Sequence, residues 1–254
     1  MEINLKTFIK KILPSRVIEV FSRNKINISK IPSKDDLVVS DLFLLRVEKN
    51  WETNFEILNI NLLTSPKSKV ENYRIRIFFF NQSGNEICLV EKNIENKIKF
   101  TLSISKLALK NNITTDSLFL IQHIFQNKIY NQYKSFPAER GYIGYYNSNF
   151  GSIKSYVHGN LDAISISPKK EIKNLGEYSF FDKQFRLQHV FKSEHKYEIY
   201  IINTTSKSQN FKILEKSNLD SKYKILKIKP RGFAKYVKEK NNSHNIKIII
   251  ESKL

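Results

Sequence analysis

Hydrophobic and polar residues alternate in short runs along most of the chain, and clusters of turn-forming residues separate the runs. Short strands at this spacing, about 8–12 residues apart, are typical of antiparallel sheets in a β-sandwich-like architecture. No strand–helix rhythm is present, so a parallel α/β sheet is not expected. We therefore predict a mainly β fold with strands at residues 37–47, 53–63, 72–81, 86–92, 97–104, 117–126, 179–191, 196–204, 209–214, 222–229, 232–238 and 245–251.

The clearest local prediction is a β-hairpin over residues 72–92. Its first strand alternates, with Arg74 and Arg76 on one face and apolar side chains on the other. Polar residues at 81–85 then provide a turn before the second strand. Residues 105–112 are compatible with either a short helical turn or a strand.

The N-terminal segment is predicted to be helical instead. Over residues 3–13, apolar side chains recur at helical spacing and lysines occupy the remaining surface, which is the pattern of an amphipathic, basic helix. A second short helix follows Pro14 and ends near Arg23. Residues 3–23 can pack on their own domain, on a partner protein or on an anionic membrane surface.

These patterns divide the chain into four parts. Residues 1–34 form the helical segment and a linker, and residues 35–126 form a first β-sandwich-like half. A connecting segment rich in glycine and tyrosine, residues 127–178, leads to a second, basic β-sandwich-like half at residues 179–254. A short strand with a Gln-His pair occurs in both halves, which suggests related units. Whether the halves form one domain or two stays open.

Positive charge is concentrated at the two ends of the chain. The formal net charge is +19. Residues 35–125 carry 11 basic and 11 acidic side chains, whereas residues 1–34 carry 8 and 2, a net +6, and residues 179–254 carry 17 and 7, a net +10. Uniform compositional drift toward lysine would not leave the middle neutral. A solvated lysine-rich surface is the simplest interpretation, and attraction to an anionic partner is the alternative.

Targeting and catalytic motifs are sparse. The single cysteine, Cys88, lies in an apolar run and is predicted to be a buried thiol. Neither a secretory signal nor an apolar run of about 18 residues is present, so we expect a cytoplasmic protein that residues 3–23 could place at the inner membrane face. Phosphate-loop, dinucleotide, nucleophile-elbow and zinc-protease motifs are missing, so enzymatic activity stays open but is not favoured.

The candidate binding segment runs over residues 139–162, which hold four of the seven glycines. Flat tyrosine rings beside glycines suit stacking on sugar rings, and an arginine can hold a carboxylate or phosphate. The alternative is that these tyrosines pack on the core. We predict a site for a glycan or glycoconjugate formed by Arg140, Tyr142, Tyr145, Tyr146, Tyr156 and Asn160.

Two histidine patterns suggest chemistry. His158 and Asp162 are four residues apart, so the carboxylate could orient the imidazole as a general base of a hydrolase or transferase, or the stretch could be a simple turn. His123, His158 and His189 could together hold zinc, although histidines on strands are commonly core or surface residues. No cofactor is expected, and zinc is the exception these histidines allow.

Basic strands near the C-terminus interleave lysines with Tyr223, Phe233 and Tyr236. Such a surface has the ingredients for binding nucleic acid or acidic lipid. Ordinary β alternation with lysines on an exposed edge accounts for it more simply, so nucleic acid is not expected as a partner. The leading hypothesis is a non-catalytic β protein that recognises a glycan, with an enzyme and an anionic-polymer binder as alternatives.

Overall fold

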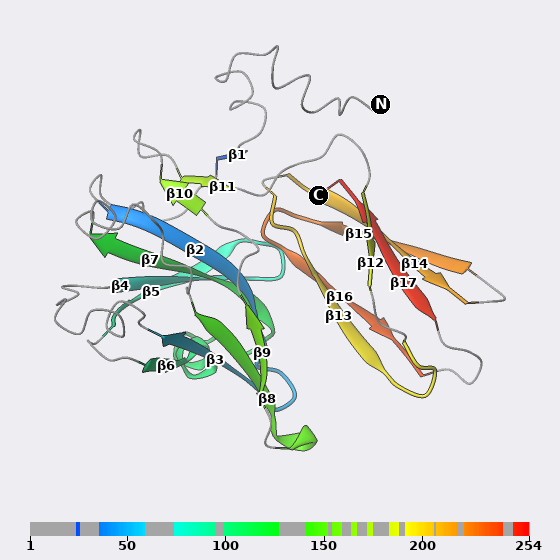
Figure 1. The fold of residues 1–254 in the computed structure, drawn as a ribbon, viewed down its shortest axis with the longest axis horizontal. Helices are drawn as coiled ribbons and strands as arrows, with labels where there is room; N and C mark the ends of the chain where they lie inside the picture. The colour runs from blue at the N-terminus through cyan, green and yellow to red at the C-terminus, as the bar shows by residue number, and fades with distance from the viewer. Residues whose placement is uncertain are drawn as a thin grey trace, which may run out of the picture.

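The prediction of a mainly β chain built from antiparallel sheets is confirmed. Figure 1 shows the strands of the first half on the left and those of the second half on the right. The structure is a computed structural model, and it describes residues 24–25, 36–58, 74–94, 99–126, 141–151, 154–158, 164–166, 172–174, 183–187, 191–205, 207–217, 221–240 and 246–253.

The first half contains two four-stranded sheets. The central sheet has the strand order β2 (Asp36–Leu45), β7 (Ser117–Gln126), β4 (Arg74–Phe80) and β5 (Glu86–Asn93). The tyrosine sheet has the order β6 (Lys99–Ser103), β3 (Trp51–Leu58), β8 (Tyr142–Asn147) and β9 (Ser155–His158). Strands β8 and β9 come from the segment expected to connect the halves, yet they extend the first half's second sheet through the pairing of β8 with β3.

The second half contains a four-stranded sheet and a two-stranded ribbon. The basic sheet has the order β12 (Lys183–Arg186), β17 (Lys247–Ser252), β14 (Gln209–Lys216) and β15 (Ser221–Ile228). The ribbon pairs β13 (Tyr197–Ile202) with β16 (Phe233–Lys238). A small sheet joins β1 (Asn24–Lys25), β11 (Ile172–Asn174) and β10 (Ile164–Ile166). Each strand predicted in the two halves has a counterpart here.

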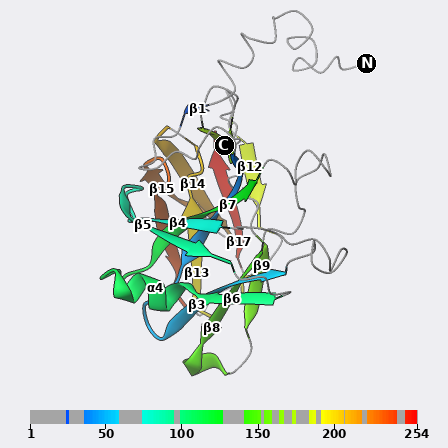
Figure 2. The same cartoon turned by 90° about the vertical axis from the view of Figure 1, so that its left-hand side faces the viewer.

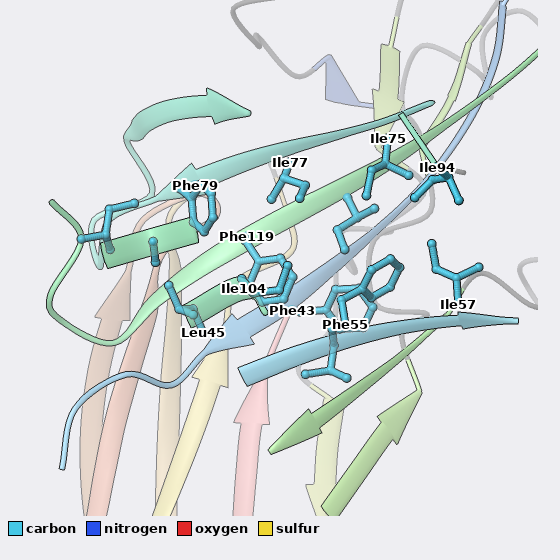
Figure 3. Close-up of a cluster of buried hydrophobic side chains, with 14 residues drawn as sticks. Phe43, Leu45, Phe55, Ile57, Ile75, Ile77, Phe79, Ile94, Ile104 and Phe119 are labelled. Carbon is cyan, nitrogen blue, oxygen red and sulfur yellow. The ribbon is translucent and has the colours of Figure 1, made fainter. Parts of the chain in front are cut away.

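The first core lies between the central and tyrosine sheets. Alternate side chains of the central sheet meet inward-facing side chains of β3 and β8, because successive residues of a strand point to opposite faces. Figure 3 shows these side chains filling the space between β3 and the central strands. The buried members include Phe43, Ile75, Phe79, Phe119 and Phe55.

The opposite face of the central sheet is also buried, and this second core joins the two halves. Phe78, Phe80 and Leu120 point away from the first core and pack with Phe233 of the ribbon. The ribbon's other face covers the basic sheet in a third core that includes Phe211. The molecule therefore stacks four layers in the order tyrosine sheet, central sheet, ribbon and basic sheet. Strands buried on both faces need near-continuous apolar runs, which explains the four apolar residues 77–80 in β4.

The described residues contain one α-helix, and it lies within the first half rather than near the N-terminus. It is α4 (Ile104–Lys110), and Ser103 caps it by accepting a hydrogen bond from the Lys106 amide. Figure 2 shows α4 beside β3, where buried Ile104 and Ala108 extend the first core. The open choice between helix and strand at residues 105–112 is thereby resolved in favour of the helix. The predicted helical segment at residues 3–23 lies outside the described residues.

The turn of the predicted 72–92 hairpin touches the second half directly. The Phe233 amide donates a hydrogen bond to the Gln82 carbonyl over 3.1 Å. Gly84 has φ +81°, and a Cβ added there would overlap the carbonyl oxygen of Pro230. The close approach of these two turns therefore requires glycine at position 84 for both its backbone conformation and its lack of a side chain.

We expect Gly84→Ala to lower the free energy of unfolding by about 2–4 kcal/mol, because it combines backbone strain with overlap at the contact between the halves. Gly151→Ala is the matched control, since Gly151 also has positive φ, +102°, but its added Cβ would meet no atom within 4 Å. Chemical denaturation of both variants separates the two effects. Equal losses of stability would show that the contact between the turns contributes nothing beyond backbone strain.

Candidate functional site

Three of the four predicted tyrosines share the face of the tyrosine sheet that points away from the core. In β8, Tyr142, Gly144 and Tyr146 alternate with inward-facing Ile143, which is fully buried. The β9 strand adds Tyr156, which lies opposite Gly144 in the strand register. Period-two alternation thus gathers three aromatic rings from two neighbouring strands on one surface, which we call the tyrosine face.

Tyr156 is the most exposed ring of the tyrosine face, at 52% relative exposure. Its ring lies beside Gly144, where an added Cβ would stand 3.1 Å from a ring carbon. The Tyr156 hydroxyl donates a hydrogen bond to Glu56 Oε1 over 3.2 Å. Glycine at position 144 therefore leaves the space that the ring uses, and Glu56 fixes the far end of the ring.

Glu56 is a fixed acceptor on the same face. Lys99 Nζ lies 2.9 Å from its carboxylate and Lys154 Nζ 3.6 Å. Partial burial raises the pKa of Glu56, but the hydrogen bond and charge of Lys99, the Tyr156 hydroxyl and the charge of Lys154 together lower it below its ordinary value. The group is therefore ionised at neutral pH and accepts hydrogen bonds from hydroxyl groups.

Tyr145 does not lie on the tyrosine face, although the sequence placed it among the ligand contacts. Its hydroxyl donates a hydrogen bond to the backbone carbonyl of Leu44 over 2.6 Å, and its ring packs against the first core. Burial raises the pKa of Tyr145 well above its ordinary value, so the phenol stays protonated. This tyrosine links the tyrosine sheet to the central sheet.

Several predicted site residues lie outside the described residues, namely Arg140, Asn160, Asp162 and His189. The backbone of His158 ends β9, directly opposite Tyr142 in the register, but its side chain is also outside them. The pairing of His158 with Asp162 and the histidine triad consequently remain predictions. Within the described part of the chain, no three His, Cys, Asp or Glu side chains gather as a metal site would require.

His123 and Cys88 are the other chemically reactive side chains that the sequence singled out. His123 is fully buried on the core side of β7, with its ring centroid 6.0 Å from that of Phe55. Cys88 is half-buried, and burial, followed by the charge of Glu86, raises the pKa of its thiol. Neither group is presented to solvent in a reactive form.

A second polar cluster, which the sequence did not predict, lies where the first half meets the ribbon. We call it the junction cluster, and it centres on Arg46 in the turn between β2 and β3. The Arg46 guanidinium lies between two aromatic rings, 4.4 Å from the centroid of Trp51 and 4.7 Å from that of Tyr200. Both distances are within the range of cation–π attraction. Trp51, the only tryptophan of the chain, thus contacts the arginine that also contacts Tyr200 of the second half.

Two carboxylates complete the junction cluster. Arg46 Nε lies 3.0 Å from Asp116 Oδ2, and Arg46 Nη2 lies 2.9 Å from Glu198 Oε2 on the ribbon. The Tyr200 hydroxyl donates a hydrogen bond to Asp116 Oδ2 over 2.8 Å, and Lys235 Nζ lies 3.3 Å from Glu198. Burial raises the pKa of Glu198, but Lys235, Arg46 and Lys49 outweigh it and lower the pKa below its ordinary value.

The backbone around Arg46 is held equally firmly. The Arg46 amide donates a hydrogen bond to Thr53 Oγ1, and the Thr53 hydroxyl donates one back to the Arg46 carbonyl, both over 2.9 Å. The Val47 amide donates to Asp116 Oδ1 over 3.0 Å. These hydrogen bonds fix the backbone that carries the guanidinium, which suits a structural joint between the halves.

No protein-family model matches this chain, and no curated protein is similar to it in sequence. The part of the chain that the structure describes also has no helix of the length and apolarity needed to cross a bilayer.

We expect Arg46→Ala to lower the free energy of unfolding by about 3–5 kcal/mol, because it removes the guanidinium from buried Asp116 and leaves Glu198 with only Lys235 and Lys49 as cationic partners among the described residues. Lys196→Ala is the control, since Lys196 also pairs with a carboxylate, Glu239, over 2.8 Å but on the exposed surface, where we expect a change within about 1 kcal/mol. Urea denaturation compares them. A small effect of Arg46→Ala would mean that the ion pairs only offset their desolvation.

The junction cluster also predicts a pH dependence of stability. The folded-state pKa of Glu198 lies below its unfolded-state value, so its ionised form stabilises the fold above about pH 4.3, and this contribution is lost as the pH falls through the folded-state pKa. The stability gap between wild type and Glu198→Gln should therefore be widest at neutral pH and narrow in acid. Thermal unfolding between pH 3 and pH 7, with Glu239→Gln as the control, measures this gap. A gap that is constant with pH would contradict the prediction.

Proposed function

We propose that the protein is a non-catalytic recognition protein that binds a glycan or glycoconjugate on the tyrosine face. The observation that carries the proposal is the exposed Tyr156 ring beside Gly144, with its hydroxyl bonded to Glu56. Aromatic rings are amphipathic contact surfaces, and the flat apolar side of a sugar ring stacks on them while its hydroxyl groups seek acceptors. Tyr156 provides the aromatic surface and Glu56 provides the acceptor, and a hydrogen bond connects the two side chains.

The electrostatics of this face favour recognition over acid catalysis. Neighbouring Lys99, Tyr156 and Lys154 lower the pKa of the Glu56 carboxyl group, so it is ionised at neutral pH. An ionised carboxylate lacks the proton that a general acid must donate. The described residues of the face also lack a second carboxylate close enough to act with it. In β3, Glu52 and Glu56 are four residues apart on the same strand face, which corresponds to about 13 Å along a strand.

The sheet beneath the tyrosine face supports a rigid site. Inward-facing Ile143 and Phe55 are fully buried in the first core, so the strands that carry the tyrosines are fixed by packing. A site on a rigid sheet loses little conformational entropy when a ligand binds. A flat, partly polar surface of this kind suits extended polar ligands better than small apolar molecules, which bind in concave pockets.

We expect Tyr156→Ala to weaken glycan binding about five- to tenfold, because loss of one stacking surface of about 1–1.5 kcal/mol corresponds to that change in affinity. The full chain is applied to a glycan array, and the best hits are titrated by calorimetry. Tyr223→Ala is the matched control, since Tyr223 is an even more exposed tyrosine, at 67%, on the basic sheet.

The proposal fails if the wild-type chain binds no glycan on the array, or if Tyr156→Ala and Tyr223→Ala weaken binding equally. Thermal unfolding of both variants accompanies the titration. Because both rings are exposed, we expect their unfolding temperatures to stay close to that of the wild type.

A further inference from the structure

Among the described strands, β15 forms one edge of the basic sheet. Strand β15 is the last strand in the order β12–β17–β14–β15, and within the described residues no strand pairs with its outer side. Seven of its eight residues are exposed or half-buried. The edge of a sheet presents a row of backbone N–H and C=O groups that a further strand can pair with.

The two faces of β15 differ in chemistry. Tyr223 and Ile225 point to one face and are 67% and 57% exposed, while Lys222 and Lys224 point to the other face and are also exposed. On the first face, Lys212 of β14 lies 5.2 Å above the Tyr223 ring. Lysines alone would be an ordinary protection against edge-to-edge association, but an exposed tyrosine and isoleucine side by side act in the opposite sense.

We propose that β15 is a docking edge for an extended acidic segment of a partner protein, which adds a strand to the basic sheet. The incoming strand would alternate acidic residues, facing Lys222 and Lys224, with apolar residues, facing Tyr223 and Ile225. Main-chain hydrogen bonds would supply affinity, and the alternating side chains would supply specificity. The net charge of +10 over residues 179–254 would speed the encounter with an acidic partner.

Charge disfavours a second copy of this chain as the occupant. In an antiparallel pair of two β15 strands, every register that brings the two apolar faces together also brings the two lysine faces together. Like charges directly opposite each other destabilise paired strands. An acidic strand from another protein replaces the repulsion between lysines with attraction and keeps the apolar contact.

The test uses the full chain and a labelled ten-residue peptide that alternates glutamate with valine and threonine. Its comparison probes are a peptide of the same charge with two central prolines and a single-stranded oligothymidine. We expect the alternating peptide to bind at least tenfold more tightly than the proline peptide in fluorescence anisotropy, because proline cannot donate the main-chain hydrogen bonds. Hydrogen exchange of the amides at residues 221–226 should slow when the alternating peptide binds.

The matched variants reverse two charges each. Lys222→Glu with Lys224→Glu on β15 should weaken peptide binding at least tenfold, whereas Lys106→Glu with Lys110→Glu on α4 should leave it unchanged, since all four lysines are exposed. The proposal is overturned if the alternating peptide does not bind, if both peptides bind equally, or if oligothymidine binds more tightly with the same dependence on Lys222 and Lys224. The last outcome would identify a nucleic-acid surface.

Discussion

The burial of the central sheet on both faces is the constraint from which the rest of the architecture follows. One face meets the tyrosine sheet, and the other presents Phe78, Phe80 and Leu120 to the ribbon. Burying a large apolar side chain contributes about 1.5–3 kcal/mol, so the second face represents on the order of 10 kcal/mol. That is comparable to the whole net stability of a typical domain. Exposing this face to water would therefore cost a free energy comparable to the stability of the first half, and the ribbon avoids that cost by covering it.

The junction cluster adds direction to this apolar contact. Hydrophobic packing is non-directional, so it alone would let the ribbon slide over the central sheet. Arg46 is held between the rings of Trp51 and Tyr200 and by hydrogen bonds of its backbone. Its guanidinium binds the Glu198 carboxylate at 2.9 Å, and this contact requires a specific placement of the ribbon. The contact of Gly84 with the Pro230 turn is a second fixed point on the same interface. Apolar area thus provides the strength of the joint, and polar contacts at two separate places determine its geometry.

The strands could be read from the sequence because alternation and turn residues are local signals, and the turn at residues 81–85 formed as expected. Arg74 and Arg76 share one face of the hairpin, as predicted. The sequence did not reveal that this face would be covered, so that Arg76 is only 5% exposed and pairs with Glu91 over 2.8 Å. What covers a strand face depends on distant segments. Arg46 and Glu198 are separated by 152 residues, which no local pattern reveals. The inward direction of Tyr145, in contrast, follows from its place between Gly144 and Tyr146, so the period-two rule separates it from the other tyrosines of the predicted site.

The register that builds the first core also builds the tyrosine face. Pairing of β8 with β3 places Ile143 opposite Phe55 on the inner side and Gly144 opposite Asn54 on the outer side. A shift of one residue would turn Ile143 and Tyr145 outward and would bury Tyr142 and Tyr146. It would also remove the glycine from its place beside the Tyr156 ring. Because the core strongly disfavours such a shift, the positions of the outward rings are set by apolar packing on the opposite side of the same strands. Outward residues of these strands can therefore be substituted without disturbing the packing that positions them, which is the property that the proposed binding surface would need.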